Sequence, residues 1–242
     1  MTLKKYFDTN GAIYMGASRY QDNCNIAIYG IPYDGTTSFR PGSRFGPSSI
    51  REVSEGIETY CPELNKDLND INYTDLGTLK IPHGSPEPII TLVNEITSEL
   101  LAKQIKPLML GGEHTISIGA INAIHDLYPD LIVIQLDAHA DLRNEWLGSK
   151  FNHACTMKRC LDFLPRKQLF QVGIRSGTKE EFKELRASNR LISSNSGEAE
   201  IELKKALLPY KNNPIYLTLD LDWFDPSVLP GTGTPEPGGS FW

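Results

Sequence analysis

The segment from Leu131 to Asp141 places the strongest constraint on how this chain can fold. Residues Leu131–Leu136 form an apolar run, which is typical of a strand buried on both faces. The run ends in three polar residues at alternate positions, Asp137, His139 and Asp141. If the backbone stays extended there, these side chains point the same way, and burying them together is costly unless a cation lies between them. We therefore predict a divalent metal site, in preference to a simple cap on the strand and the helix that follows it.

The length and composition of the chain indicate a soluble globular protein that does not bind nucleic acid. The chain has 242 residues, of which 40% are apolar and 22% are charged. These values are typical of one soluble globular domain with a substantial core. The net charge is −6, and no basic stripe is available to neutralise phosphate groups. This argues against nucleic acid as a partner.

The sequence also argues against a membrane-bound or secreted protein. No apolar run reaches the length of about eighteen residues expected for a transmembrane helix. The N-terminus has no apolar region typical of a signal peptide. Four cysteines without Cys-x-x-Cys spacing are interpreted as reduced thiols, namely Cys24, Cys61, Cys155 and Cys160. We therefore expect a cytoplasmic protein with no membrane association.

Apolar strands alternate with helical patterns along the chain. Strands are predicted at 25–31, 71–76, 106–110, 131–136, 168–174, 191–193 and 214–219. Helices are predicted at 48–58, 86–102, 179–186 and 198–208, with a further helix ending at 125. This alternation predicts a single α/β domain over 1–242 with a mostly parallel sheet and helices on both of its faces. In such sheets the functional site lies beyond the carboxyl ends of the strands.

Two more predicted strands end in candidate metal ligands. Gly111 and Gly112 follow one strand, and they belong to no nucleotide-binding motif. They allow a sharp turn that would bring His114 to the same edge of the sheet. The last strand is followed by Asp220 and Asp222.

The complete set of candidates favours two metal ions. It comprises His114, Asp137, His139, Asp141, Asp220 and Asp222. Six ligands exceed the four of a structural zinc site, and none of them is a cysteine. Carboxylates with some imidazole suit Mn²⁺, while Fe²⁺, Co²⁺ and Zn²⁺ remain open. Such a centre activates a bridging water for hydrolysis at a carbon or phosphorus atom.

Five separated motifs resemble the ureohydrolase family, which includes arginase and agmatinase. In order along the chain they are GGEHT, DAHADLR, HACTMKR, DLDWFDP and GTGTPEPGG. The loop GIPYDGTTSFRPGSRFGPSSIR and the segment QVGIRSG are most similar to bacterial agmatinases. The resemblance begins near Asn25 and covers nearly all of the chain after it.

The resemblance implies an arginase-like three-layer α/β/α fold with two Mn²⁺ ions per subunit. By motif match, the ligands of one ion are His114, Asp137, Asp141 and Asp220. Those of the other are Asp137, His139, Asp220 and Asp222. A hydroxide bridging the ions would attack the guanidinium carbon of agmatine and release urea and putrescine, a step of polyamine biosynthesis. His153 matches the proton-shuttling histidine of the family, and the family commonly forms trimers or hexamers.

The sequence departs from the family pattern at two places. Trp223 occupies a position that is usually smaller, and the chain ends soon after GTGTPEPGG. The family continues with further elements and a carboxylate that holds the guanidinium group. We therefore expect a domain that lacks its last C-terminal elements.

Several alternative functions remain open at this stage. The substrate could be guanidinobutyrate, guanidine, formimidoylglutamate or arginine, and arginine is less favoured because no loop for its α-carboxylate and α-amino groups is recognisable. The chain could also be an inactive metal-binding fragment, or a zinc amidohydrolase of the deacetylase kind.

Overall fold

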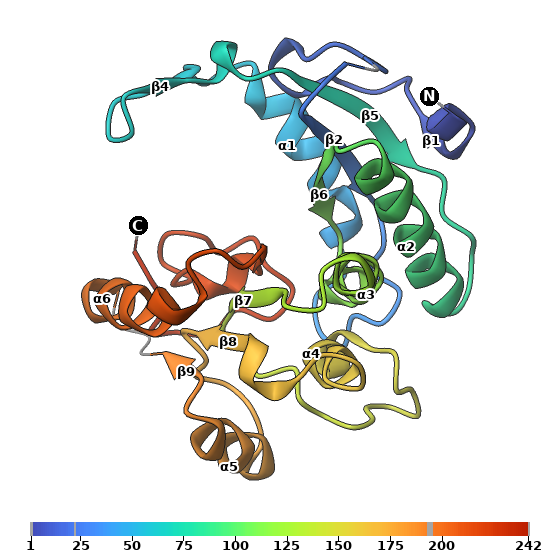
Figure 1. Cartoon of the computed structure of the whole chain (residues 1–242). Coiled ribbons are helices and arrows are strands. Elements are labelled where there is room, and N and C mark those ends of the chain that lie inside the picture. Colours follow the sequence, from blue (N-terminus) through green and yellow to red (C-terminus); the bar gives the residue numbers. More distant parts are fainter. Residues whose placement is uncertain (1, 22, 193–195, 242) are drawn as a thin grey trace. The chain divides into compact units, whose positions relative to one another are not determined.

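The computed structural model describes residues 2–21, 23–192 and 196–241. The chain divides into two compact units. The first comprises 1–35 and 42–116, and the second comprises 36–41 and 117–242. Each unit has its own four-stranded sheet, so the predicted strands are distributed over two sheets (Figure 1).

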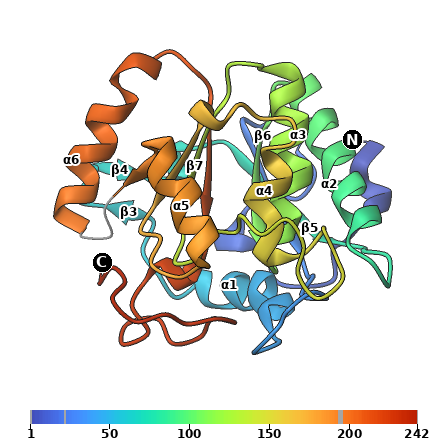
Figure 2. The same ribbon diagram turned by 90° about the horizontal axis from the view of Figure 1, so that it is seen from below.

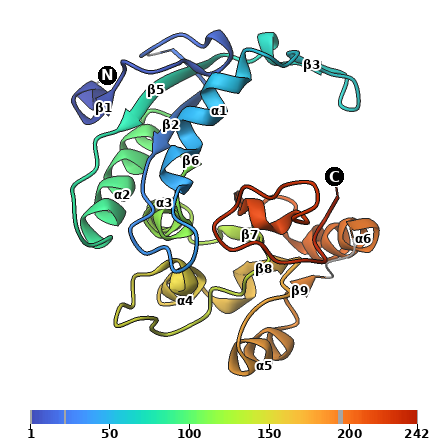
Figure 3. The ribbon, with the colours of Figure 1, turned by 180° about the vertical axis from the view of Figure 1, so that it is seen from behind.

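The sheet of the first unit has the order β1-β5-β2-β6. Strands β2 (Ile26–Ile31), β5 (Tyr73–Leu79) and β6 (Lys106–Gly111) are parallel, and β1 (Phe7–Asp8) pairs with β5 in the antiparallel direction. Helices α1 (Gly46–Ser54) and α2 (Glu87–Ala102) lie on opposite sides of this sheet (Figures 1 and 3). The buried face of α2 carries Ile89, Val93, Ile96 and Leu100, which repeat at helical spacing as predicted.

Short elements complete the first unit. A hairpin joins β3 (Tyr60–Cys61) to β4 (Lys66–Asp67). The 3-10 turns are η1 (Thr2–Tyr6), η2 (Tyr14–Gly16), η3 (Ser43–Phe45), η4 (Leu68–Asp70) and η5 (His114–Ile116). Asp34 accepts hydrogen bonds from the Gly42 amide at 2.8 Å and from Nε of Arg44 at 2.9 Å, and so ties down the loop that follows β2.

The sheet of the second unit has the order β10-β7-β8-β9, and all of its pairings are parallel. Its strands are β7 (Ile132–Leu136), β8 (Leu169–Val172), β9 (Leu191–Ile192) and β10 (Ile215–Leu219). Its helices are α3 (Ser117–Leu127), α4 (Thr156–Cys160), α5 (Lys179–Ser188) and α6 (Ser196–Leu207). Its 3-10 turns are η6 (His153–Cys155), η7 (Arg166–Gln168), η8 (Leu208–Tyr210) and η9 (Leu221–Trp223).

Helices lie on both sides of β7 in this unit. Helix α6 lies on one side, and α3 and α4 lie on the other (Figures 1 and 2). Ile132, Ile134 and Phe170 of the sheet form an apolar core with Ala199 of α6. The α/β class and the mostly parallel strands predicted from the sequence are therefore confirmed.

Two predicted boundaries are wrong for local reasons. The strand expected to end before Gly77 continues through it to Leu79 as β5. The pairing of β5 with β2 shifts register here, and Gly77 accommodates the irregularity with a φ of +94°. A side chain there would collide with the Asp8 carbonyl oxygen. Helix α1 ends at Ser54 and not near 58. Ser193, expected in a strand, lies outside the described residues.

A search of the described residues finds no helix that is both long enough and apolar enough to span a membrane.

Candidate metal centre

The carboxyl ends of β7 and β10 lie side by side in the second unit. The two strands are parallel neighbours, and Leu136 pairs with Leu219 at their ends. The amide of Asp220 donates to the Leu136 carbonyl at 2.9 Å. The acidic residues that follow each strand therefore start from the same edge of the sheet, as the sequence predicts.

Asp137, His139 and Asp222 form one compact group of donor atoms. One donor atom from each lies within 4.8 Å of the others. Nδ1 of His139 is 3.0 Å from Oδ2 of Asp222 and 3.7 Å from Oδ1 of Asp137. The side chains of Asp137 and Asp222 are only 1% and 3% exposed. Two buried carboxylates thus lie near the same nitrogen, Nδ1, of the His139 ring.

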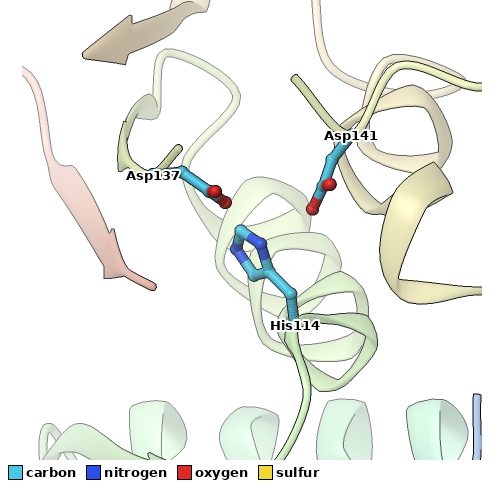
Figure 4. A group of neighbouring side chains, drawn as sticks. All are labelled: His114, Asp137 and Asp141. Atoms are coloured by element: carbon cyan, nitrogen blue, oxygen red, sulfur yellow. The ribbon is translucent and has the colours of Figure 1, made fainter. Parts of the chain in front are cut away.

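Asp141 also lies close to Asp137. A carboxylate oxygen from each lies within 4.8 Å of the other (Figure 4). Asp141 has a φ of +53°, so the backbone leaves the extended conformation that would have aligned all three residues of Asp-x-His-x-Asp. Asp137 belongs to both groups of donor atoms, one with His139 and Asp222 and the other with Asp141.

His114 belongs to the first unit. It is buried and begins η5, directly after the turn at the end of β6. Gly112 makes this turn possible with a φ of +27°, and a side chain on it would collide with the backbone of Tyr33. Motif matching makes His114 a candidate ligand of one ion, along with Asp137, Asp141 and Asp220.

Asp220 and His153 lie outside both groups of donor atoms found among the described residues. Asp220 caps η9 by accepting a hydrogen bond from the amide of Asp222 at 3.2 Å. His153 begins η6 and contacts two hydroxyls of the 36–41 segment. Its Nδ1 is 3.2 Å from Oγ1 of Thr36, and its Nε2 is 3.2 Å from Oγ of Ser38.

The carboxylates of this group change the pKa of His139. Burial lowers the pKa of the imidazole, but the hydrogen bonds to Asp137 and Asp222 outweigh burial and raise this pKa to about 11. Burial and the neighbouring Asp137 charge raise the pKa of Asp222. The two carboxylates thus hold a proton on His139 where a divalent cation would otherwise balance their charge. A donor set of two buried carboxylates and one imidazole suits a divalent transition metal.

Hydrogen-bond donors hold these carboxylates in place, and sequence reasoning missed them. Nε2 of Gln135 donates to Asp137 at 2.7 Å, and Nε2 of Gln171 donates to Oε1 of Gln135 at 2.7 Å. Both amides are fully buried. Asp222 accepts from the Ala138 amide and from the Thr234 hydroxyl, each at 3.1 Å. A polar residue inside an otherwise apolar strand was the available signal for the two glutamines.

Trp223 packs against the carboxyl end of β8. A side chain on Gly173 would collide with its indole ring, so the ring lies directly against the backbone at the end of β8. It also packs edge-on against Phe224, with ring centroids 5.1 Å apart. The unusual size of this residue therefore serves packing.

Comparison with known proteins agrees with this geometry. Residues 24–242 match the Arginase family. An agmatinase from Bacillus subtilis is 38% identical over 95% of this chain and 79% of its own length. An N(1)-aminopropylagmatine ureohydrolase from Thermococcus kodakarensis is 37% identical over 91% of this chain and 75% of its own length. The crystal structure of agmatine ureohydrolase of Thermoplasma volcanium has a TM-score of 0.83 and 32% identity, and the match covers 98% of this chain and 80% of that chain. This chain therefore belongs to the arginase family, and it is a hydrolase that acts on guanidino carbon–nitrogen bonds.

Proposed function

We propose that the protein is a manganese-dependent agmatinase, which hydrolyses agmatine to urea and putrescine. The observation that carries this proposal is the group of Asp137, His139 and Asp222, whose two buried carboxylates lie close enough to the imidazole to bind one cation with it. The similarity to relatives named for activity on agmatine and aminopropylagmatine supports the choice of substrate. The products would place the reaction in polyamine biosynthesis.

Two Mn²⁺ ions would share the acidic edge of the sheet. One would be held by His114, Asp137, Asp141 and Asp220. The other would be held by Asp137, His139, Asp220 and Asp222. When bound, such a pair acidifies a water molecule and so supplies the nucleophile for attack on the guanidinium carbon. The protein's own part is to hold its carboxylates rigid before the ions arrive.

That rigidity comes from hydrogen bonds to the carboxylates of Asp137 and Asp222. Asp137 receives the Gln135 amide on Oδ2 and the His139 backbone amide on Oδ1. Asp222 receives the Ala138 amide on Oδ1 and the Thr234 hydroxyl on Oδ2. Since each oxygen already has a donor, neither carboxylate can rotate without losing a hydrogen bond. This arrangement lowers the reorganisation that binding and catalysis would need.

His153 is the proposed proton donor to the leaving amine. Its two ring nitrogens lie 3.2 Å from the hydroxyl oxygens of Thr36 and Ser38, and its backbone amide donates to Oγ1 of Thr36 at 3.0 Å. Both hydroxyl oxygens can accept from ring N–H groups, so this setting would accommodate the imidazolium form. The imidazolium suits general acid catalysis, because the ordinary pKa of a histidine side chain lies near neutrality.

A urea-release assay with Mn²⁺ tests the function directly. The substrate panel comprises agmatine, N(1)-aminopropylagmatine, guanidinobutyrate, guanidine and arginine, and ammonia or formamide release from formimidoylglutamate is followed separately. Agmatine should give the highest kcat/KM. Activity should disappear on chelation and in Asp137→Asn and Asp222→Asn. Asp126→Asn, which changes an exposed carboxylate on α3, is the matched control.

The outcomes separate the competing proposals. Urea release that persists after chelation and in both active-site variants contradicts the metal mechanism. A preference for another guanidino or formimidoyl compound reassigns the substrate within the family. Bound Mn²⁺ without turnover of any compound would indicate a metal-binding fragment. We further propose a cytoplasmic homo-oligomer, a trimer or hexamer, which sedimentation equilibrium would test.

A further inference from the structure

Glu236 lies beside His139 on the side of the ring that faces away from Asp137 and Asp222. Its Oε1 is 3.7 Å from Nε2 of His139, whereas Nδ1 of the same ring faces the two aspartates. The imidazole is thus placed between a carboxylate pair on one nitrogen and a single carboxylate on the other. The Glu236 side chain is 37% exposed, so it is not one of the buried ligands.

Ser176 connects Glu236 to the backbone of the metal-binding segment. Oγ of Ser176 is hydrogen-bonded to Oε1 of Glu236 at 2.9 Å. The backbone of Ser176 pairs with His139 in a parallel bridge, donating to the Ala138 carbonyl at 2.9 Å and accepting from the Ala140 amide at 3.1 Å. One residue therefore fixes both the backbone of the histidine and the carboxylate beside its ring.

Arg175 holds the loop that carries Glu236. Its guanidinium donates to the Glu236 carbonyl at 2.7 Å and to the Pro237 carbonyl at 3.1 Å. The same group donates to the Asp222 carbonyl at 2.6 Å. The loop with Glu236 is therefore tied to the turn that presents Asp222, one of the aspartates facing His139.

Two further features limit the freedom of this loop. Glu236 lies between Pro235 and Pro237, whose rings fix their φ angles. The Asp225 carboxylate accepts the Gly238 amide at 2.7 Å, which closes the base of the loop. These constraints hold the Glu236 carboxylate in place beside the His139 ring.

We propose that Glu236 is a positioning residue whose carboxylate, 3.7 Å from Nε2 of His139, favours the ring proton on Nε2 by electrostatic attraction and so keeps Nδ1 as the lone-pair donor to the cation held with Asp137 and Asp222. A metal-bound histidine commonly donates its other ring N–H to a carboxylate, which fixes the tautomer and the ring orientation and raises the basicity of the ligand. Sequence matching assigned no role to this residue. The inference rests on the metal centre of the proposed function, and it concerns metal affinity and not the identity of the substrate.

Metal binding, measured without turnover, tests this role. Mn²⁺ is titrated into Glu236→Gln, Glu236→Ala and the unaltered protein by calorimetry, and bound metal is counted after gel filtration. We expect the dissociation constant of one ion to rise by about 10- to 100-fold in both variants, the range typical when a group that orients a ligand histidine is removed. The other ion should be nearly unaffected. Ser176→Ala should weaken the same ion to a smaller extent.

Controls separate positioning from folding and from substrate binding. Glu145→Gln, which changes an exposed glutamate, should bind Mn²⁺ normally. Circular dichroism and thermal unfolding of the metal-free variants should match those of the unaltered protein, because Glu236 is partly exposed. KM for agmatine at saturating Mn²⁺ should change less than threefold.

Three outcomes would decide the inference. Unchanged affinity for both ions in Glu236→Gln and Glu236→Ala overturns it. Unchanged affinity with a KM raised more than tenfold also overturns it and assigns Glu236 to the substrate cation instead. If the unaltered protein binds two ions and the variants lose one, the inference stands even when agmatine is not the substrate, so failure of the proposed function remains distinguishable.

Discussion

Mn²⁺ binding to the group of Asp137, His139 and Asp222 should release a proton. In the metal-free protein the pKa of His139 is about 11, so at pH 7 the imidazole is protonated. A cation that takes Nδ1 must displace that proton, because only neutral imidazole is a ligand. Because pH 7 lies about 4 pH units below this pKa, removing the proton at pH 7 costs about 5 kcal/mol. This cost lowers the apparent affinity for the cation by roughly ten-thousand-fold.

The sign of this effect follows from the direction of the pKa shift. As pH rises from 7 toward 11 the proton becomes easier to remove, so the apparent affinity for this ion should rise about tenfold per pH unit. The folded pKa of His139 also lies above the ordinary value of 6.5. The stability that its charge adds to the metal-free protein is therefore complete below pH 6.5 and is lost as pH rises to 11. Mn²⁺-loaded protein should not show this loss.

Calorimetry in paired buffers measures the proton directly. Mn²⁺ is titrated at one pH between 7 and 8.5 in two buffers that differ in ionisation enthalpy, and the difference in heat gives the number of protons released. We expect about one proton for one of the two ions. His139→Asn should remove that release. A value near zero in the unaltered protein, together with an affinity independent of pH, would refute the reasoning.

Three further predictions concern other parts of the chain. Arg51→Met should destabilise the protein by about 3–5 kcal/mol in urea unfolding, because it leaves the fully buried Asp75 carboxylate without the guanidinium now bound at 2.7 and 2.9 Å, and adding Asp75→Leu should recover part of the loss. Thr178→Ala should cost about 1 kcal/mol by removing the capping box with Glu181 at the start of α5, and a thermal midpoint unchanged relative to the unaltered protein would contradict this. His153→Asn should lower kcat by about 10²- to 10⁴-fold while Mn²⁺ stoichiometry stays the same, and a loss of bound metal would instead indicate a ligand.

Local sequence determined which residues could carry the chemistry. The apolar run before Asp137 predicted a buried strand, and β7 (Ile132–Leu136) lies there. The same reasoning placed Asp220 and Asp222 after β10, which proves to be the parallel neighbour of β7. Alternation of strands and helices fixed the α/β class, because hydrophobic periodicity is a local property that a single sequence reveals. Motifs at matching positions then gave the family.

Tertiary structure decided how those residues are grouped. Periodicity suggested that Asp137, His139 and Asp141 align. The backbone instead bends at Ala138 and is left-handed at Asp141, and the donor atoms of the motif fall into two groups that share Asp137. Gln171 and Glu236 approach the centre only through strand pairing and loop closure. Contacts of this kind join residues that are tens of positions apart, and no local pattern encodes which of them meet. The sequence by itself therefore determined the types of candidate ligand and their place at the strand ends, while the tertiary structure decided which side chains hydrogen-bond to those candidates.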